Sequence, residues 1–269
     1  MDQSRRDFLR KAGLASLIAG TGFPLLDAAV SLAGGQAAAG HAAAAVGVKQ
    51  WGMVVDIEKC LRPGLADACA EACRKAHNVP VIPDPKREIK WIWTENFENV
   101  FPEQKHSRIS GKMTGKPVVV LCNHCTSPAC VKVCPTQATW KRKEDGIVMM
   151  DMHRCIGCRF CMAACPYGAR SFNFHDPRKY LDVKNLATDF PTRTKGVVEK
   201  CTFCEERLRK GLQPACVEAA GKRGVEDALV FGNIGDPDSR ISRVLSDNFT
   251  MVRRLELGTG PNVFYLLKT

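Results

Sequence analysis

The sequence lacks the motifs that mark most haem-, nucleotide- and molybdenum-dependent enzymes. No C-x-x-C pair is followed by histidine, which excludes covalently attached c-type haem, so no haem is expected. There is no phosphate-binding loop, and Gly258-Thr259-Gly260 fits a turn rather than a dinucleotide-binding fingerprint. No nucleophile–base pair and no molybdenum-binding motif are recognisable. The chain is therefore not expected to be an enzyme on its own.

Long apolar runs are also missing after the first 46 residues, and none approaches the roughly 20 residues that span a bilayer. The N-terminal segment has SRRDFLRK at 4–11, then an apolar stretch, then a small-residue zone at 34–46 with Ala-x-Ala sites. This layout predicts a cleaved twin-arginine export signal over residues 1–46 and a periplasmic protein. Pro24 and Asp27 interrupt the apolar stretch, so a retained anchor is the less favoured alternative. Membrane contact is then expected only through partner proteins.

What the sequence has in abundance is cysteine, with 14 among 269 residues. An exported chain could use them for a disulfide scaffold, whereas regular spacing indicates metal ligands. The stretch CIGCRFCMAACP at 155–166 is the C-x2-C-x2-C-x3-C-P run of bacterial ferredoxins, and CNHCTSPACVKVCP at 122–135 repeats it with one longer gap. Zinc ribbons need two C-x2-C pairs, but here three closely spaced cysteines precede a fourth, twice over. The spacing therefore favours iron–sulfur clusters.

In such runs the first three cysteines bind one [4Fe–4S] cluster, and the fourth binds the neighbouring cluster. This exchange of ligands predicts two sites in the middle of the chain. Site A consists of Cys122, Cys125, Cys130 and Cys165. Site B consists of Cys155, Cys158, Cys161 and Cys134.

Two further cysteine-rich stretches, one on each side of this pair, are incomplete. The last stretch ends in Ala220 where a cysteine is expected, and the first has an enlarged loop in place of its second cysteine. The same exchange still predicts a complete site C of Cys201, Cys204, Cys216 and Cys73. Cys60 and Cys69 are left over and are expected to form a disulfide or to remain thiols. The sequence thus predicts three [4Fe–4S] clusters.

The formal net charge of +11 invites comparison with nucleic-acid-binding proteins. Residues 1–46 contribute four basic and three acidic side chains, which leaves +10 for the rest of the chain. Each oxidised [4Fe–4S] unit with four thiolates adds about −2, so three clusters reduce the excess to roughly +4. The basic residues are therefore expected to balance cluster charge, and no nucleic-acid partner is expected.

Short strands and helices are predicted around the cysteines. Runs of β-branched or alternating residues predict strands at 52–57, 88–97, 116–121, 229–234 and 263–267. Asp145-Gly146 between ATWKRK and IVMMD predicts a hairpin, because this dipeptide favours positive φ. A short helix is predicted at 237–245, started by Asp236. Ile156, Phe160 and Phe203, which lie between ligands, are expected to shield clusters from water.

With its motifs in this order, the sequence resembles the four-cluster ferredoxin-like subunits of molybdoenzyme-associated and quinone-linked redox complexes. These include the iron–sulfur subunits of dimethyl sulfoxide, polysulfide and tetrathionate reductases. The resemblance covers most of residues 50–235. The segments WIWTENFENVFP, GIVMMDMHRCIGCRFCMAACPYGARSF and FPTRTKGVVEKC, together with the export signal, are most similar to the DsrO type, the periplasmic iron–sulfur subunit of the sulfite-reduction-associated (Dsr) transmembrane complex.

The resemblance implies an α+β fold of two pseudo-symmetric bacterial ferredoxin-like modules. The inner module would comprise residues 116–195, and the outer module residues 47–115 with 196–269. It also implies a non-catalytic subunit that relays single electrons, in dissimilatory sulfur metabolism, between a polytopic quinone-interacting membrane subunit and other redox centres. A multihaem cytochrome and other Dsr-type subunits would be further partners. The alternative is the iron–sulfur subunit of a polysulfide, tetrathionate or dimethyl sulfoxide reductase-type molybdoenzyme. Loss of the fourth cysteine set departs from the four-cluster pattern.

Overall fold

The structure, a computed structural model, describes residues 49–104 and 111–267. All of these residues belong to one of the two units into which the chain divides, His41–Thr269. The predicted export signal lies outside the described residues. In the described ranges, no helix is both long and apolar enough to cross a membrane.

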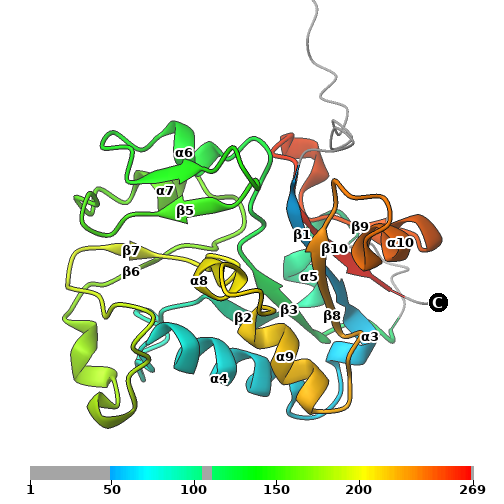
Figure 1. Cartoon of the computed structure of the whole chain (residues 1–269), viewed down its shortest axis with the longest axis horizontal. Helices are drawn as coiled ribbons and strands as arrows, with labels where there is room; N and C mark the ends of the chain where they lie inside the picture. Colours follow the sequence, from blue (N-terminus) through cyan, green and yellow to red (C-terminus); the bar gives the residue numbers. More distant parts are fainter. Residues whose placement is uncertain (1–48, 105–110, 268–269) are drawn as a thin grey trace, which may run out of the picture. The chain divides into compact units, whose positions relative to one another are not determined.

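A four-stranded sheet forms one side of the described unit (Figure 1). Its strand order is β8 (Leu229–Asn233), β1 (Trp51–Asp56), β10 (Val263–Leu266) and β9 (Thr250–Met251). β1 pairs antiparallel with β8 and parallel with β10. Successive side chains of a strand point to opposite faces, so Met53 and Val55 join the main core while Val54 packs under helix α10 (Arg240–Asp247). The sheet is therefore apolar on both faces.

Two helices that carry cysteines pack against each other beside this sheet. Helix α4 (Leu65–His77) contacts α9 (Ala215–Lys222), and the two lie side by side in Figure 1. Gly64 precedes α4 and Asn78 follows it, and both adopt the left-handed conformation that glycine and asparagine tolerate best. The short α3 (Ile57–Cys60) follows β1 directly and is capped by the Asp56 carboxylate, which accepts a hydrogen bond from the Lys59 amide at 3.0 Å.

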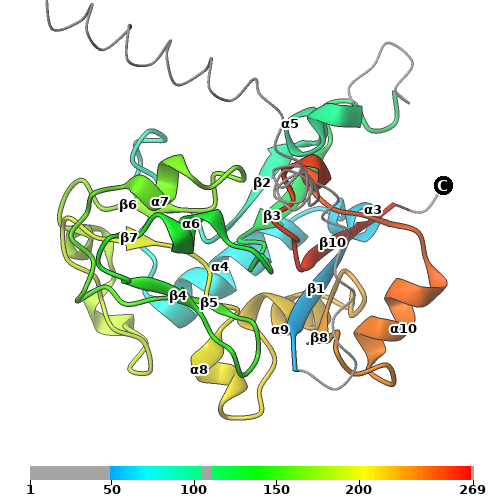
Figure 2. The ribbon, with the colours of Figure 1, turned by 90° about the horizontal axis from the view of Figure 1, so that it is seen from above.

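The rest of the described chain is made of short hairpins and single helical turns. Antiparallel pairs join β2 (Ile92–Asn96) to β3 (Pro117–Leu121), β4 (Thr139–Lys141) to β5 (Val148–Met150) and β6 (Ser171–Phe172) to β7 (Val198–Glu199). The short helices are α5 (Phe97–Val100), α6 (Ala129–Lys132), α7 (Phe160–Ala163) and α8 (Glu205–Leu208). Turns of 3-10 helix occur at Pro102–Gln104, Pro177–Tyr180, Val183–Asn185 and Leu255–Leu257. In Figures 1 and 2, the hairpins β4–β5 and β6–β7 lie with α6 and α7, away from the four-stranded sheet.

The α+β class and most predicted strands are confirmed, with two differences. The strand predicted at 88–97 begins only at Ile92, because its partner β3 ends opposite it at Leu121 before the chain turns away at Cys122. The helix predicted from Asp236 begins at Arg240 instead. Its N-cap is Ser239, whose hydroxyl accepts from the Ser242 amide at 3.2 Å.

Candidate metal centres

Site B is a cavity close to the protein surface. The cavity is lined by its four predicted ligands from both middle stretches, Cys134, Cys155, Cys158 and Cys161. The apolar residues Ala138, Met150 and Val198 also line it. Cys161 is buried on α7, and the other three cysteines are half-buried. Four converging thiols in an apolar setting match the donor set that iron–sulfur clusters require.

Site A also has one buried ligand, Cys122, and three half-buried ones. Burial raises the pKa of Cys125 to about 12, and the charges of Cys122, Cys130 and Cys165 contribute to that shift. The pKa of Cys165 is raised by burial and by the charges of Cys122 and Cys130. Because such charge effects act only at short range, the fold brings the fourth cysteine of one stretch to the first three of the other.

Site C combines cysteines that are far apart in the sequence. Cys73 lies on α4, Cys216 lies on the adjacent α9, and Cys201 and Cys204 precede α8. Burial raises the pKa of Cys73 well above its usual range, and the charges of Cys204, Cys201 and Cys216 raise it further. All four cysteines are buried. The packing of α4 on α9 is thus what assembles this set.

The backbone of the ligand loops is shaped to bind an anionic group. Each C-x2-C loop contains residues with positive φ, among them His124 at 41°, Gly157 at 70° and Phe203 at 56°. Such residues turn successive N–H groups inward as a nest, an arrangement found at many iron–sulfur sites. In site C, the amides of Phe203 and Ala215 donate to the sulfurs of Cys201 and Cys204 at 3.4 and 3.3 Å.

Buried polar groups beside the thiols also fit a polar occupant. Thr202 lies between two site C cysteines, and Asn123 follows a site A cysteine. Both side chains are buried, and their polar atoms have no hydrogen-bond partner among the described residues. The Asn123 amide is a donor of the kind from which the sulfides of a [4Fe–4S] cluster accept, whereas Thr202 also lines a second cavity with Phe190 and Arg193. The residues present therefore fit the group that the cysteine spacing predicts.

Comparison with known proteins agrees with this geometry. Residues 116–179 match the family model described as a 4Fe-4S dicluster domain. The Hdr-like menaquinol oxidoreductase iron-sulfur subunit 1 of Archaeoglobus fulgidus is 44% identical, over 81% of this chain and 83% of the relative. The iron-sulfur cluster-binding subunit of menaquinone reductase from Nitratidesulfovibrio vulgaris is 36% identical, over 81% and 88%. A tetrathionate reductase subunit of Salmonella typhimurium is 35% identical, over 99% and 89%.

The chain belongs to this family of iron–sulfur subunits. Membership confirms that it is an electron-transfer subunit of an oxidoreductase complex rather than an enzyme on its own. The matched family model also supports the prediction that the chain binds [4Fe–4S] clusters.

Beside site C, this iron–sulfur subunit has a histidine that the sequence analysis did not single out. His77 is 1% exposed; its Nδ1 lies 2.8 Å from the carbonyl oxygen of Cys73 and 3.6 Å from the Cys73 sulfur. Its Nε2 lies 2.8 Å from the Glu206 carboxylate. His77, Glu206 and Cys204 also lie close enough together to hold a metal ion, but Cys204 already belongs to site C. The sequence could have indicated this contact, because residues four apart on a helix lie side by side and His77 follows the predicted ligand Cys73 by four.

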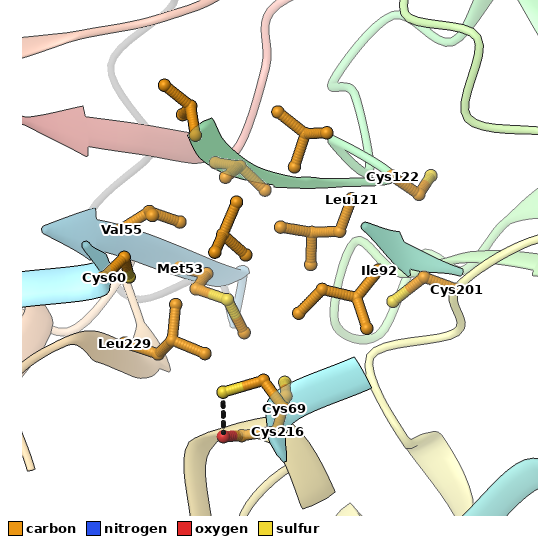
Figure 3. Packing of buried hydrophobic residues seen from close by; sticks show 14 of the residues in the cluster. Met53, Val55, Cys60, Cys69, Ile92, Leu121, Cys122, Cys201, Cys216 and Leu229 are labelled. Carbon is orange, nitrogen blue, oxygen red and sulfur yellow. Dashed lines mark hydrogen bonds between the residues drawn. The ribbon is translucent and has the colours of Figure 1, made fainter. Parts of the chain in front are cut away.

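Cys60 and Cys69 do not complete a further four-thiol set. The structure has both as free buried thiols that donate to different carbonyls, Cys60 to Ala228 at 3.5 Å and Cys69 to Cys216 at 3.3 Å. Burial raises the pKa of Cys69 to about 11. Apolar side chains such as Leu229 pack in the same region as both thiols (Figure 3). Ala220, at the expected fourth cysteine position, is fully buried.

The predicted shielding residues behave differently from one another. Phe203 is buried, as expected, and stacks on the His124 ring with 3.7 Å between centroids. Ile156 and Phe160 are instead 66% and 59% exposed, so the expectation that they exclude water is wrong. They lie beside site B ligands together with the exposed Arg159, so the surface next to site B carries both apolar and basic side chains.

Proposed function

We propose that this chain is a periplasmic subunit that relays single electrons through three [4Fe–4S] clusters. It would connect a polytopic quinone-interacting membrane subunit with other redox centres in dissimilatory sulfur metabolism. The observation that supports this most directly is the gathering of twelve cysteines into three four-thiol sets by the fold. We assign the sets to one inner and one outer ferredoxin-like module. Site A with site B would form the inner module, and site C belongs to the outer one.

We infer that the three sets lie in the order B, A, C. Arg170 contacts the Cys130 sulfur of site A at 3.1 Å. Burial raises the pKa of Cys161 of site B, and the charge of Arg170 partly opposes this rise. On the other side, burial raises the pKa of Cys201 of site C to about 12, and Cys122 of site A adds to that shift. Site A therefore neighbours both other sites, which is the arrangement of a linear electron relay.

Site B is the best candidate for the end that meets a redox partner. Three of its four cysteines are half-buried, whereas all four of site C are buried. The exposed side chains of Ile156 and Phe160, with Val133 at 39%, flank its ligands. Exposed apolar side chains next to a ligand set fit an interaction site. We propose that a redox partner docks here, with this cluster close to the contact.

The relatives' names favour a quinone-linked complex. Two of them are a menaquinol oxidoreductase subunit and a menaquinone reductase subunit. Within that class we propose the sulfite-reduction-associated, DsrO-type complex, in which a multihaem cytochrome would be a further partner. The second candidate is a molybdoenzyme complex of the tetrathionate, polysulfide or dimethyl sulfoxide reductase type. It is favoured by the match of 99% of this chain to a tetrathionate reductase subunit.

Iron analysis of the purified chain tests the cluster count. Three [4Fe–4S] clusters require roughly twelve irons and as many acid-labile sulfides per chain. The double variant Cys60→Ala/Cys69→Ala should keep that content, because neither cysteine belongs to a proposed ligand set. Close to sixteen irons in the wild type, or a loss of about four in the variant, would show that a fourth cluster is bound.

Purification from native membranes tests the partner assignment. Co-purification of a polytopic membrane subunit and a multihaem cytochrome is the result expected for the sulfite-reduction-associated complex. A molybdopterin-containing subunit in their place would replace this assignment with the second candidate.

A further inference from the structure

Two buried cations occupy the places where neighbouring sites meet. Arg170 is 5% exposed, and its Nη2 donates to the Cys130 sulfur at 3.1 Å and to the Thr139 hydroxyl at 2.8 Å. Its Nη1 lies 3.6 Å from the Met150 sulfur, and Met150 also lines the site B cavity. Arg170 thus spans the boundary between sites A and B.

Lys200 has the matching position between sites A and C. Its side chain is fully buried, and its Nζ donates to the carbonyl oxygen of Cys201 at 2.7 Å and to that of Val148. Burial lowers the pKa of Lys200, while the charge of Cys122 from site A and that of Cys201 from site C oppose this shift. Val148 in turn donates its amide to Nδ1 of His124, in the site A loop, at 3.1 Å. The ammonium group therefore lies between a site C ligand and the site A loop.

Neither cation has a carboxylate partner. Among the ion pairs of the described ranges, none involves Arg170 or Lys200. This contrasts with Arg193, which is equally buried but pairs with Glu199 at 2.7 Å. A buried charge without a counter-ion is strongly unfavourable, so the fold must supply negative charge in another form. Cysteines of the proposed sites are the nearest source of such charge. Arg170 contacts the Cys130 sulfur, and the charges of Cys130, Cys161 and Cys122 raise its pKa although burial acts in the opposite direction.

We propose that Arg170 and Lys200 are shared counter-ions of adjacent clusters, each raising the reduction potentials of the two clusters it separates. The proposal rests on the proposed function, because it requires that sites A, B and C hold clusters. Arrival of one electron at a site adds one negative charge there, with no bond made or broken. A fixed positive charge nearby favours that arrival, and a hydrogen bond from the cation to a ligand sulfur acts in the same direction. Arg170 would act on sites A and B, and Lys200 on sites A and C.

The test is an anaerobic redox titration of the full-length, cluster-loaded protein, followed by electron paramagnetic resonance. Arg170→Met should lower two of three potentials, and Lys200→Met should also lower two, with one potential lowered in both variants. A charged hydrogen bond contributes about 1.5–3 kcal/mol, which corresponds to at least a tenfold change in the ratio of reduced to oxidised cluster, or about 59 mV for one electron. Arg170→Lys and Lys200→Arg should retain most of the wild-type values. Lys132→Met, an exposed cation two residues from Cys134, should change each ratio less than about twofold.

Each outcome decides the proposal. Wild-type protein without cluster signals would refute the proposed function itself. Wild-type signals with unchanged potentials in both methionine variants, or with all three lowered equally by each, would refute the shared counter-ion role alone. If a methionine variant loses its iron, the charge-conserving variant decides. Retention of iron and potentials there supports the charge requirement, and loss of iron there shows that the shape of the side chain matters instead.

Discussion

Breaking the buried ion pair between Arg193 and Glu199 should destabilise the protein more than any surface change. Both side chains are completely buried, and the guanidinium Nη2 lies 2.7 Å from the carboxylate. The same carboxylate accepts from Trp91 Nε1 at 3.1 Å and from Asn173 Nδ2 at 2.5 Å. In Glu199→Gln the shape is kept, but the buried Arg193 loses its counter-ion. Removing one partner of a buried pair costs about 3–5 kcal/mol, a large part of the total stability of roughly 5–15 kcal/mol.

Unfolding of the Glu199→Gln variant should begin at site C. Arg193 also donates to the carbonyl oxygen of His77, the last residue of the helix that carries Cys73. Anaerobic urea unfolding, followed by tryptophan fluorescence and by visible cluster absorption, measures the effect. Glu88→Gln is the matched control, because Glu88 and Lys90 form a partly exposed pair at 3.6 Å whose loss should cost at most about 1 kcal/mol.

Two results would refute this reasoning. The first is a Glu199→Gln variant within about 1 kcal/mol of the wild type, which would mean that Arg193 is neutralised in another way. The second concerns the double variant Arg193→Met/Glu199→Met. Removing both charges should recover part of the loss, since no buried charge is then left unpaired. A double variant less stable than Glu199→Gln would mean that packing, rather than charge, dominates.

Three further predictions concern the cluster sites. Gly157→Ala should reduce site B occupancy and iron content, because an added Cβ would clash with the Gly196 carbonyl oxygen; Gly168→Ala, also at positive φ but with open space, should keep its iron. Cys165→Ser should weaken or alter the site A signal in electron paramagnetic resonance, and a change at site B instead would contradict the ligand exchange. Acid should bleach the visible absorption, because protons compete with iron for sulfurs such as Cys125, whose pKa burial raises to about 12. The stability due to ligation is thus lost as the pH falls, and bleaching only above about pH 9 would contradict this.

The sequence predicts well those features that depend on local pattern. The β-branched run at 116–121 becomes β3, and Asp145-Gly146 makes the predicted hairpin turn, with Gly146 at φ 73°. The three ligand sets, which rest on local spacing and the exchange of the fourth cysteine, stay a prediction. Strand pairing could not be predicted in this way. The parallel pair of β1 and β10 joins segments about 200 residues apart in the sequence, and tertiary packing decides it.

The sequence gives little indication of the residues that surround the sites. Nothing in the sequence distinguishes Arg170 and Lys200 from an exposed basic residue such as Lys132, and only the fold buries them. The positive φ angles in the ligand loops are also only partly predictable from the sequence. The glycine at position 157 indicates a positive φ. His124 and Phe203 also have positive φ, but their residue types do not indicate it, because the surrounding structure imposes this conformation.

The uncompensated charges of Arg170 and Lys200 also bear on how the protein matures. A chain that folded completely before receiving iron would have to bury two cations with no carboxylate to neutralise them. The compact state is therefore reached at low cost only together with the cofactor. We therefore expect a chain without iron to fold less completely and to be cut faster by proteases than the loaded chain, which limited proteolysis of the two forms would measure.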